Sequence, residues 1–281
     1  MILIADAGST KTKWAFVDEN RHKPAKFFTS RGINAIRDDD ETVKSVLSEL
    51  PLEGGSPFSF IHFYGAGCVG GDVNTRIQKI LADHFSLPIE MVEVESDLVG
   101  ASLALCGREA GVACILGTGS NSALWDGNKI VKNIRPLGYI LGDEGSGAHI
   151  GKLLIADWLK GLLPADLAEE LQKRCNLSYP EMIASVYRRP EPNRFMADFT
   201  HFVSEHIDNT YLQSLVKKSF AAFVERNLLL YDGIEHLKVN FTGSVAMVFR
   251  RQLDEVLVAY GLTIGRVEPD PLPLMLDLWC N

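Results

Sequence analysis

The chain twice contains a short apolar run, a turn of glycine and small hydroxyl residues, and a second short apolar run. The two copies read ILIADAGSTKTKWAFVD at residues 2–18 and CILGTGSNSALWD at residues 114–126. A gapless alignment places Gly8 on Gly119 and Trp14 on Trp125. Apolar runs on both sides of a glycine turn predict a β-hairpin. We therefore predict one hairpin in each half of the chain and an internal duplication.

After each hairpin, the sequence alternates between strand and helix patterns. Residues 1–108 read as three strands, followed by helix, strand, helix, strand and helix. The pattern restarts near residue 109 and continues into a long, mostly helical stretch. We predict an α/β protein with two domains, at residues 1–108 and 109–281, the second enlarged by helices. Because no low-complexity linker separates them, the domains are expected to pack together across a cleft.

Composition and charge limit the partners of such a chain. Its 281 residues are 46% hydrophobic and 23% charged, a balance typical of globular proteins. The formal net charge of −8, without a run of Lys or Arg, argues against nucleic-acid binding. Five scattered cysteines without a C-x-x-C pair indicate reduced thiols, and no apolar run reaches the length of a membrane span. We expect a cytoplasmic protein that binds neither nucleic acid nor membrane.

The two glycine turns are candidate phosphate sites. Glycine allows a tight turn, and successive amides with small hydroxyl side chains can bind a phosphate, although a purely structural hairpin would look similar. Asp6, at the end of the preceding strand, could hold Mg²⁺ through water. The second turn begins like a dinucleotide-binding G-x-G-x-x-G motif, but Ser122 replaces its last glycine and a strand follows instead of a helix. The candidate phosphate-binding residues are Gly8, Ser9, Thr10, Lys11, Thr12, Thr118, Gly119 and Ser120.

Three other strand ends carry candidate functional residues. Asp97 follows a predicted strand and begins a predicted helix, so it could cap the helix, act as a general base, or do both. Asp143 lies in the stretch GDEGSG, whose acids could bind sugar hydroxyls and whose plainer interpretation is a loop before a helix. Gly243 and Ser244 form a strand-to-helix turn on which a nucleoside could stack.

These segments, in this order and at these separations, resemble the five motifs of the sugar kinase, actin and heat-shock ATPase superfamily. Within it, DAGSTKTKW, ESDLVGA, LGTGSNS, GDEGSG and FTGSVA are similar to the N-acetylglucosamine kinase branch, which is grouped with the BadF/BadG ATPases. The resemblance implies two ribonuclease H-like domains with a nucleotide cleft between them, and ATP and Mg²⁺ as cofactors. Many relatives are dimers, which makes a homodimer an expectation here.

The resemblance also implies a role for each candidate residue. Asp6 would help to hold Mg²⁺, and the two glycine turns would contact the ATP phosphates. Asp97 would be the catalytic aspartate. The hexosamine would be bound by Asn34, Asp97 and Asp143, and the adenosine by Gly243 and Ser244.

Two features depart from the pattern of these relatives. Lys13 is a cation where relatives often carry a small or acidic residue. The chain end PDPLPLMLDLWCN lacks the small-residue helix start that returns the last helix of relatives to the first domain, and Pro271 and Pro273 argue against a helix that begins earlier.

The expected activity is phosphorylation of an amino sugar by ATP, with the 6-hydroxyl of N-acetylglucosamine or glucosamine as acceptor. Two alternatives stay open. One is the ATPase activator of a radical dehydratase found among BadF/BadG relatives, whose cysteine pattern this chain does not resemble. The other is a non-catalytic protein that binds a sugar or a nucleotide.

Overall fold

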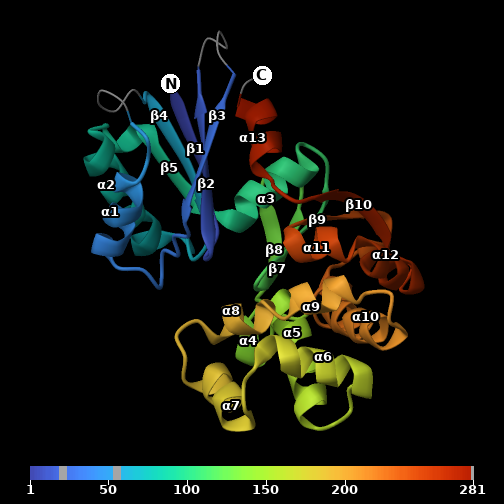
Figure 1. The fold of residues 1–281 in the computed structure, drawn as a ribbon. Coiled ribbons are helices and arrows are strands. Elements are labelled where there is room, and N and C mark those ends of the chain that lie inside the picture. Colours follow the sequence, from blue (N-terminus) through green and yellow to red (C-terminus); the bar gives the residue numbers. More distant parts are fainter. Residues whose placement is uncertain (19–23, 53–57, 280–281) are drawn as a thin grey trace. The chain divides into compact units, whose positions relative to one another are not determined.

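The computed structural model describes residues 1–18, 24–52 and 58–279, and the chain divides into two compact units (Figure 1). Unit 1 comprises Met1–Arg108 together with the segment from Asp270 onward, and unit 2 comprises Glu109–Pro269. The expected second domain, residues 109–281, therefore differs from unit 2 at its C-terminal end.

Unit 1 is built on a mixed sheet with the strand order β3-β2-β1-β4-β5. Strand β1 pairs antiparallel with β2 and parallel with β4, which places it at the centre of the sheet. Its elements are β1 (Ile2–Ala7), β2 (Lys11–Val17), β3 (Lys26–Arg31), α1 (Asp40–Ser48), β4 (Phe60–Gly65), α2 (Gly71–Phe85), η1 (Ile89–Met91), β5 (Val92–Ser96), α3 (Asp97–Cys106) and α13 (Leu272–Trp279).

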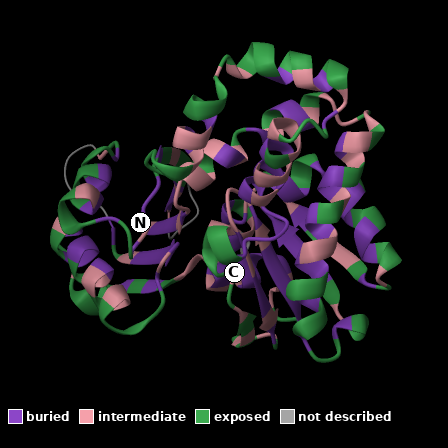
Figure 2. Ribbon diagram, turned by 90° about the horizontal axis from the view of Figure 1, so that it is seen from below, coloured by how far each residue is buried: buried purple, intermediate pink, exposed green. Residues whose placement is uncertain are grey.

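The two faces of this sheet carry separate cores, because successive side chains of a strand point to opposite faces. Leu3, Ala5 and Trp14 pack with the apolar residues of α1 and α2. Ile4 and Ala15 pack on the other face with residues of α3 and α13. Figure 2 shows the strands as mainly buried and the outer faces of the helices as exposed.

Unit 2 has a sheet of order β10-β9-β6-β7-β8 and a helical region inserted between β8 and β9. One continuous core joins its strands to the helices. Its strands are β6 (Gly111–Leu116), β7 (Ser120–Trp125), β8 (Ile130–Ile134), β9 (Lys238–Thr242) and β10 (Thr263–Glu268). Its helices are α4 (Gly138–Leu141), α5 (Gly147–Leu159), α6 (Ala165–Cys175), α7 (Tyr179–Tyr187), α8 (Pro192–Ala197), α9 (Thr200–Glu205), α10 (Thr210–Arg226), η2 (Leu228–Leu230), η3 (Ile234–His236), α11 (Ser244–Val248) and α12 (Arg250–Ala259).

The two sheets follow the same plan, since each begins with three consecutive antiparallel strands and then adds two parallel strands on the far side of its first strand. This confirms the predicted α/β class and the repeated strand order. It also corrects the gapless alignment of the two hairpins. The first hairpin closes at the pair Ala7–Thr12 and the second at Leu116–Ser120, so the first turn is one residue longer. Trp14 and Trp125, both buried, occupy different positions along their ladders.

The chain end forms a helix that packs within unit 1. Helix α13 lies against α3, β1 and β2, and the side chains of Leu272 and Met275 are fully buried there (Figure 1). Pro273 is the second residue of this helix, where an N–H has no partner within the helix and proline is tolerated. The return of the last helix to the first domain is thus retained without the small residues of relatives.

Candidate active site

The first glycine turn is a compact hairpin loop in unit 1. Gly8 N donates to Lys11 O at 3.0 Å, and Gly32 N, just after β3, donates to Thr10 O at 3.1 Å. Lys11 is exposed, whereas the Thr12 side chain is fully buried and its hydroxyl has no hydrogen-bond partner among the described residues. Because side chains alternate along β2, the Thr12 hydroxyl points into the core and is not available to a phosphate in this structure.

Asp97 is the first residue of α3, immediately after β5. Ser96 is the N-cap of this helix, and its hydroxyl oxygen accepts a hydrogen bond from Val99 N at 3.2 Å. The cap is therefore made by the neighbouring serine, which leaves the Asp97 carboxylate for another role. Burial raises the pKa of Asp97 to about 6, although backbone N–H groups of Leu98 and Asp97 itself favour its charged form.

Asp6 lies on the same face of the unit 1 sheet as α3 and α13. It follows Ile4 at a spacing of two residues, and Ile4 packs with those helices. The pKa of Asp6 is raised to about 7, mainly by burial and also by the nearby carboxylates of Asp270 and Asp97, against the lowering effect of Lys13 and Lys11. The Asp6 and Asp97 carboxylates thus share one electronegative region of unit 1.

This region suits a divalent cation bound together with a phosphate. No cluster of three or more His, Cys, Asp or Glu side chains within the described ranges is placed to hold a metal by itself. Mg²⁺, however, commonly uses one or two carboxylates, several waters and the phosphate oxygens of its partner. A bound Mg²⁺ would neutralise the negative charge of the Asp6 and Asp97 carboxylates and so relieve their mutual repulsion. These residues therefore fit the predicted metal.

Asn34 is tied to the first glycine turn. Its Nδ2 donates to Ser9 Oγ at 2.9 Å, and its Oδ1 accepts from the backbone nitrogens of Ile36 and Arg37, each at 3.1 Å. Arg37 Nη2 also donates to Ser9 O at 3.1 Å. The residue predicted to contact the sugar and a residue predicted to contact phosphate are therefore neighbours in unit 1.

In unit 2, the structure brings the second glycine turn and the GDEGSG stretch together. Gly147 N donates to Gly117 O at 2.8 Å, and Ala148 N donates to Thr118 O at 3.1 Å. The Asp143 carboxylate accepts a hydrogen bond from the Ser120 backbone, and burial raises the pKa of Asp143 to about 6. A Cβ added at Gly119 would lie 3.0 Å from Asp143 Oδ2, so a larger residue there would push on the Asp143 carboxylate. Asp143 is thus positioned directly beside the second turn.

Gly243 connects β9 to α11 at the edge of the same turn. Its φ of +111° strains any other residue, and an added Cβ would clash with the carbonyl oxygen of Leu116. Ser244 follows as the first residue of α11. The strand-to-helix turn predicted for the nucleoside therefore lies against the end of β6, where the second glycine turn begins.

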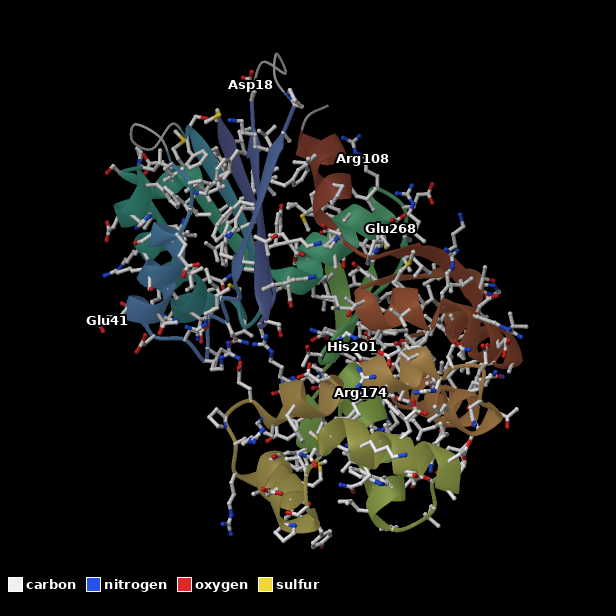
Figure 3. All side chains as sticks on the ribbon, viewed as in Figure 1. Asp18, Glu41, Arg108, Arg174, His201 and Glu268 are labelled. Carbon is white, nitrogen blue, oxygen red and sulfur yellow. The ribbon has the colours of Figure 1, made fainter. Side chains whose placement is uncertain are left out.

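A pocket of about 140 Å³ lies beside these segments, entirely within unit 2. One side consists of Gly117, Thr118, Gly147 and Ser244. The opposite side consists of residues of α8, of α9 and of the segment that joins them, together with residues of α11. The polar residues on this second side are Asp198, Thr200, His201 and Ser204 (His201 is labelled in Figure 3). None of these four residues was predicted from the sequence, because they follow no glycine turn and lie in the helical insertion.

No family model matches the chain. A solved structure from Porphyromonas gingivalis, provisionally assigned as an N-acetylglucosamine kinase, is 41% identical, has a TM-score of 0.93, and is matched over 99% of this chain and 98% of that chain. The chain belongs to the N-acetylglucosamine kinase-like family of sugar kinases. The family resemblance seen in the motifs is confirmed by this match.

Two other relatives of this N-acetylglucosamine kinase-like chain are more distant. The curated N-acetylmuramic acid/N-acetylglucosamine kinase of Clostridium acetobutylicum is 30% identical over 209 residues, which are 68% of this chain and 64% of that protein. The match thus spans less than two thirds of that relative. A Chromobacterium violaceum structure, also provisionally assigned as an N-acetylglucosamine kinase, is 18% identical with a TM-score of 0.74 over 99% of this chain and 98% of that chain, and it supports the fold alone.

The predicted site residues of this family member form one group in each unit. Asp6, the first turn, Asn34 and Asp97 belong to unit 1, whereas the second turn, Asp143, Gly243 and Ser244 belong to unit 2. No helix in the described parts of the chain is both long and apolar enough to cross a membrane.

Proposed function

We propose that the protein transfers the γ-phosphoryl group of ATP to a hydroxyl of an amino sugar. The expected acceptor is the 6-hydroxyl of N-acetylglucosamine or glucosamine. The observation that carries the proposal is Asp97: a partly buried carboxylate at a strand–helix junction, not used as the helix cap, and near Asp6, a residue at the end of β1 before the first glycine turn.

In this mechanism, Asp97 accepts the proton of the sugar hydroxyl while that oxygen forms a bond to the γ-phosphorus. The bond from the γ-phosphorus to the bridging oxygen breaks, and ADP leaves with its electron pair. A pKa of about 6 keeps Asp97 charged, and so able to accept a proton, at neutral pH. Backbone amides of the glycine turns can stabilise the charge of the transferred group.

Mg²⁺ belongs to the proposal, with Asp6 as the residue that would hold it. When bound, the ion would supply positive charge to the phosphate oxygens. In unit 2, the pocket beside Ser244 is proposed to bind the adenosine of ATP. Asn34 and Asp143 are proposed to bind hydroxyls of the sugar. A cytoplasmic location and a homodimer complete the proposal, supported by the cysteine pattern and by the family resemblance.

The test is ADP release measured with a panel of hexoses and hexosamines for the wild type, Asp97→Asn and Asp72→Asn. Asp72 lies in the first turn of α2 and is exposed, so it is a matched acidic control in the same unit. We expect hexosamine-dependent ADP release that Asp97→Asn lowers about a hundredfold or more, while Asp72→Asn leaves it unchanged. ADP release at the same rate with and without every sugar would instead indicate an ATPase, and sugar or nucleotide binding without turnover would indicate a binding protein.

A further inference from the structure

The ion pair between Lys13 and Asp270 connects two parts of unit 1 that lie 257 residues apart in the sequence. Lys13 belongs to β2, and Asp270 precedes α13. Their side chains are 25% and 20% exposed, so the ion pair is only partly accessible to solvent. Neither residue has a role in the mechanism above.

Lys13 is directed toward the region of the two functional carboxylates. It is the cross-strand partner of Asp6 in the β1–β2 ladder, and it is on the same face as Ala15, which packs with α3 and α13. The pKa of Asp6 responds to both members of the pair, since Asp270 raises it and Lys13 lowers it. Lys13 and Asp270 therefore belong to the same electrostatic group as Asp6 and Asp97.

Asp270 is held firmly in this place. Its Oδ1 accepts a hydrogen bond from Leu272 N at 3.1 Å, at the start of α13, while Oδ2 contacts the Lys13 ammonium. Leu272 and Met275 anchor α13 in the core that also contains Ala104 of α3, the helix that begins with Asp97. Packing of α13 on α3 thus fixes Asp270 relative to Asp97.

We propose that Lys13 binds the transferred phosphoryl group and that Asp270 is the positioning residue that aims its ammonium at that group. The proposal rests on the proposed function. A lysine is a flexible point charge, and phosphate oxygens are common partners for it. Without Asp270, the nearest acid across the ladder is Asp6, whose carboxylate is proposed to hold Mg²⁺. Asp270 therefore draws the ammonium away from Asp6. Lys13 stabilises charge and forms no covalent bond in the transfer.

The first test separates the charge of Asp270 from its contact with α13. Serine is also a good helix N-cap, so Asp270→Ser keeps an acceptor for Leu272 N and removes the partner of Lys13. The matched control is Asp39→Ser, because Asp39 caps α1 through a hydrogen bond from Thr42 N at 2.8 Å. We expect Asp270→Ser to lower kcat about tenfold or more, the usual effect of a lost charge-assisted contact, with KM for the sugar unchanged. Asp39→Ser should leave kcat unchanged, and urea unfolding should report the stability of both variants.

The second test uses binding rather than activity. Calorimetry with Mg²⁺-AMPPNP and Mg²⁺-ADP compares nucleotides with and without the γ-phosphoryl position. We expect Asp270→Ser and Lys13→Met each to weaken AMPPNP about tenfold and ADP less than twofold, and Lys13→Arg to restore most of the AMPPNP affinity. The double variant Lys13→Met/Asp270→Ser should be no weaker than Lys13→Met alone, because Asp270 acts through Lys13.

Two results would overturn the inference. One is an Asp270→Ser variant with normal kcat and a normal ratio of AMPPNP to ADP affinity, which would leave Asp270 as a helix cap alone. The other is a full additional loss of affinity in the double variant, which would show that the two residues act separately. Failure of the proposed function would look different, because the wild type would then release no ADP in response to any sugar. The comparison of AMPPNP with ADP affinity would still test the role of Lys13.

Discussion

Asn34 Nδ2 donates a hydrogen bond of 2.9 Å to the hydroxyl oxygen of Ser9. This bond joins the loop that follows β3 to the first glycine turn, and the contact from Arg37 to Ser9 O strengthens the same connection. A residue proposed to bind the sugar therefore also supports a turn proposed to bind phosphate. A change at one of these sites is expected to affect the other.

The Asn34→Ala substitution should weaken the binding of both substrates, the sugar and ATP. The variant loses three hydrogen bonds, to Ser9, Ile36 and Arg37, so we expect KM to rise for sugar and for ATP and the free energy of unfolding to fall by about 1–3 kcal/mol. Steady-state kinetics and urea unfolding measure the two effects. Ser9→Ala removes only the shared bond and should change KM for ATP more than stability. A rise in KM for the sugar alone would show that Asn34 does not support the turn.

The activity should depend on the ionisation of Asp97. Burial raises its pKa to about 6, and a general base must be deprotonated, so kcat should fall about tenfold per pH unit below about 6 and level off above it. Kinetics between pH 5 and 8 at saturating Mg²⁺-ATP and sugar give this profile. A rate that stays constant down to pH 5 would contradict a role for Asp97 as the base.

The Asp97→Asn substitution should stabilise the folded protein and lower its activity. The folded pKa lies above the unfolded value of 3.8, so the buried charge destabilises the fold above about pH 6 and does not below about pH 4. At pH 8 we expect the free energy of unfolding to rise by about 1–3 kcal/mol, since one pKa unit corresponds to about 1.4 kcal/mol. Urea unfolding at pH 8 and pH 5 tests this, because the gain should shrink at the lower pH. An equal gain at both pH values would point to a cause other than charge burial.

Gly243→Ala should disrupt the turn beside the proposed adenosine pocket. The alanine would combine an unfavourable positive φ with a clash against Leu116 O. Gly261→Ala is the comparison, because it also places a side chain at a positive φ, +72°, at a backbone cost of about 1–2 kcal/mol, while its Cβ meets nothing within 4 Å. We expect Gly243→Ala to destabilise more than Gly261→Ala in urea unfolding and to raise KM for ATP, which the control should leave unchanged. Equal losses for both variants would mean that the space around Gly243 is unimportant.

The local parts of the site could be predicted from the sequence. Glycine turns between short apolar runs indicated both hairpins, and Asp97 was placed correctly between β5 and α3. The cap of α3 was not predicted, because Ser96 and Asp97 are both good capping residues and only the backbone geometry distinguishes them. The wall formed by α8 and α9 was also missed, since a helical segment without a distinctive motif does not reveal which pocket it lines.

The sequence by itself determined the order of strands and helices and the positions of the glycine turns, because side-chain periodicity and the freedom of glycine act over a few residues. Tertiary structure alone decided that α13 returns to unit 1 and that Asp270 meets Lys13 beside Asp6 and Asp97. Such contacts follow from burying apolar faces that are far apart in the chain. The local sequence around Asp270, with Pro269, Pro271 and Pro273, does not indicate which surface the apolar residues of α13 will cover.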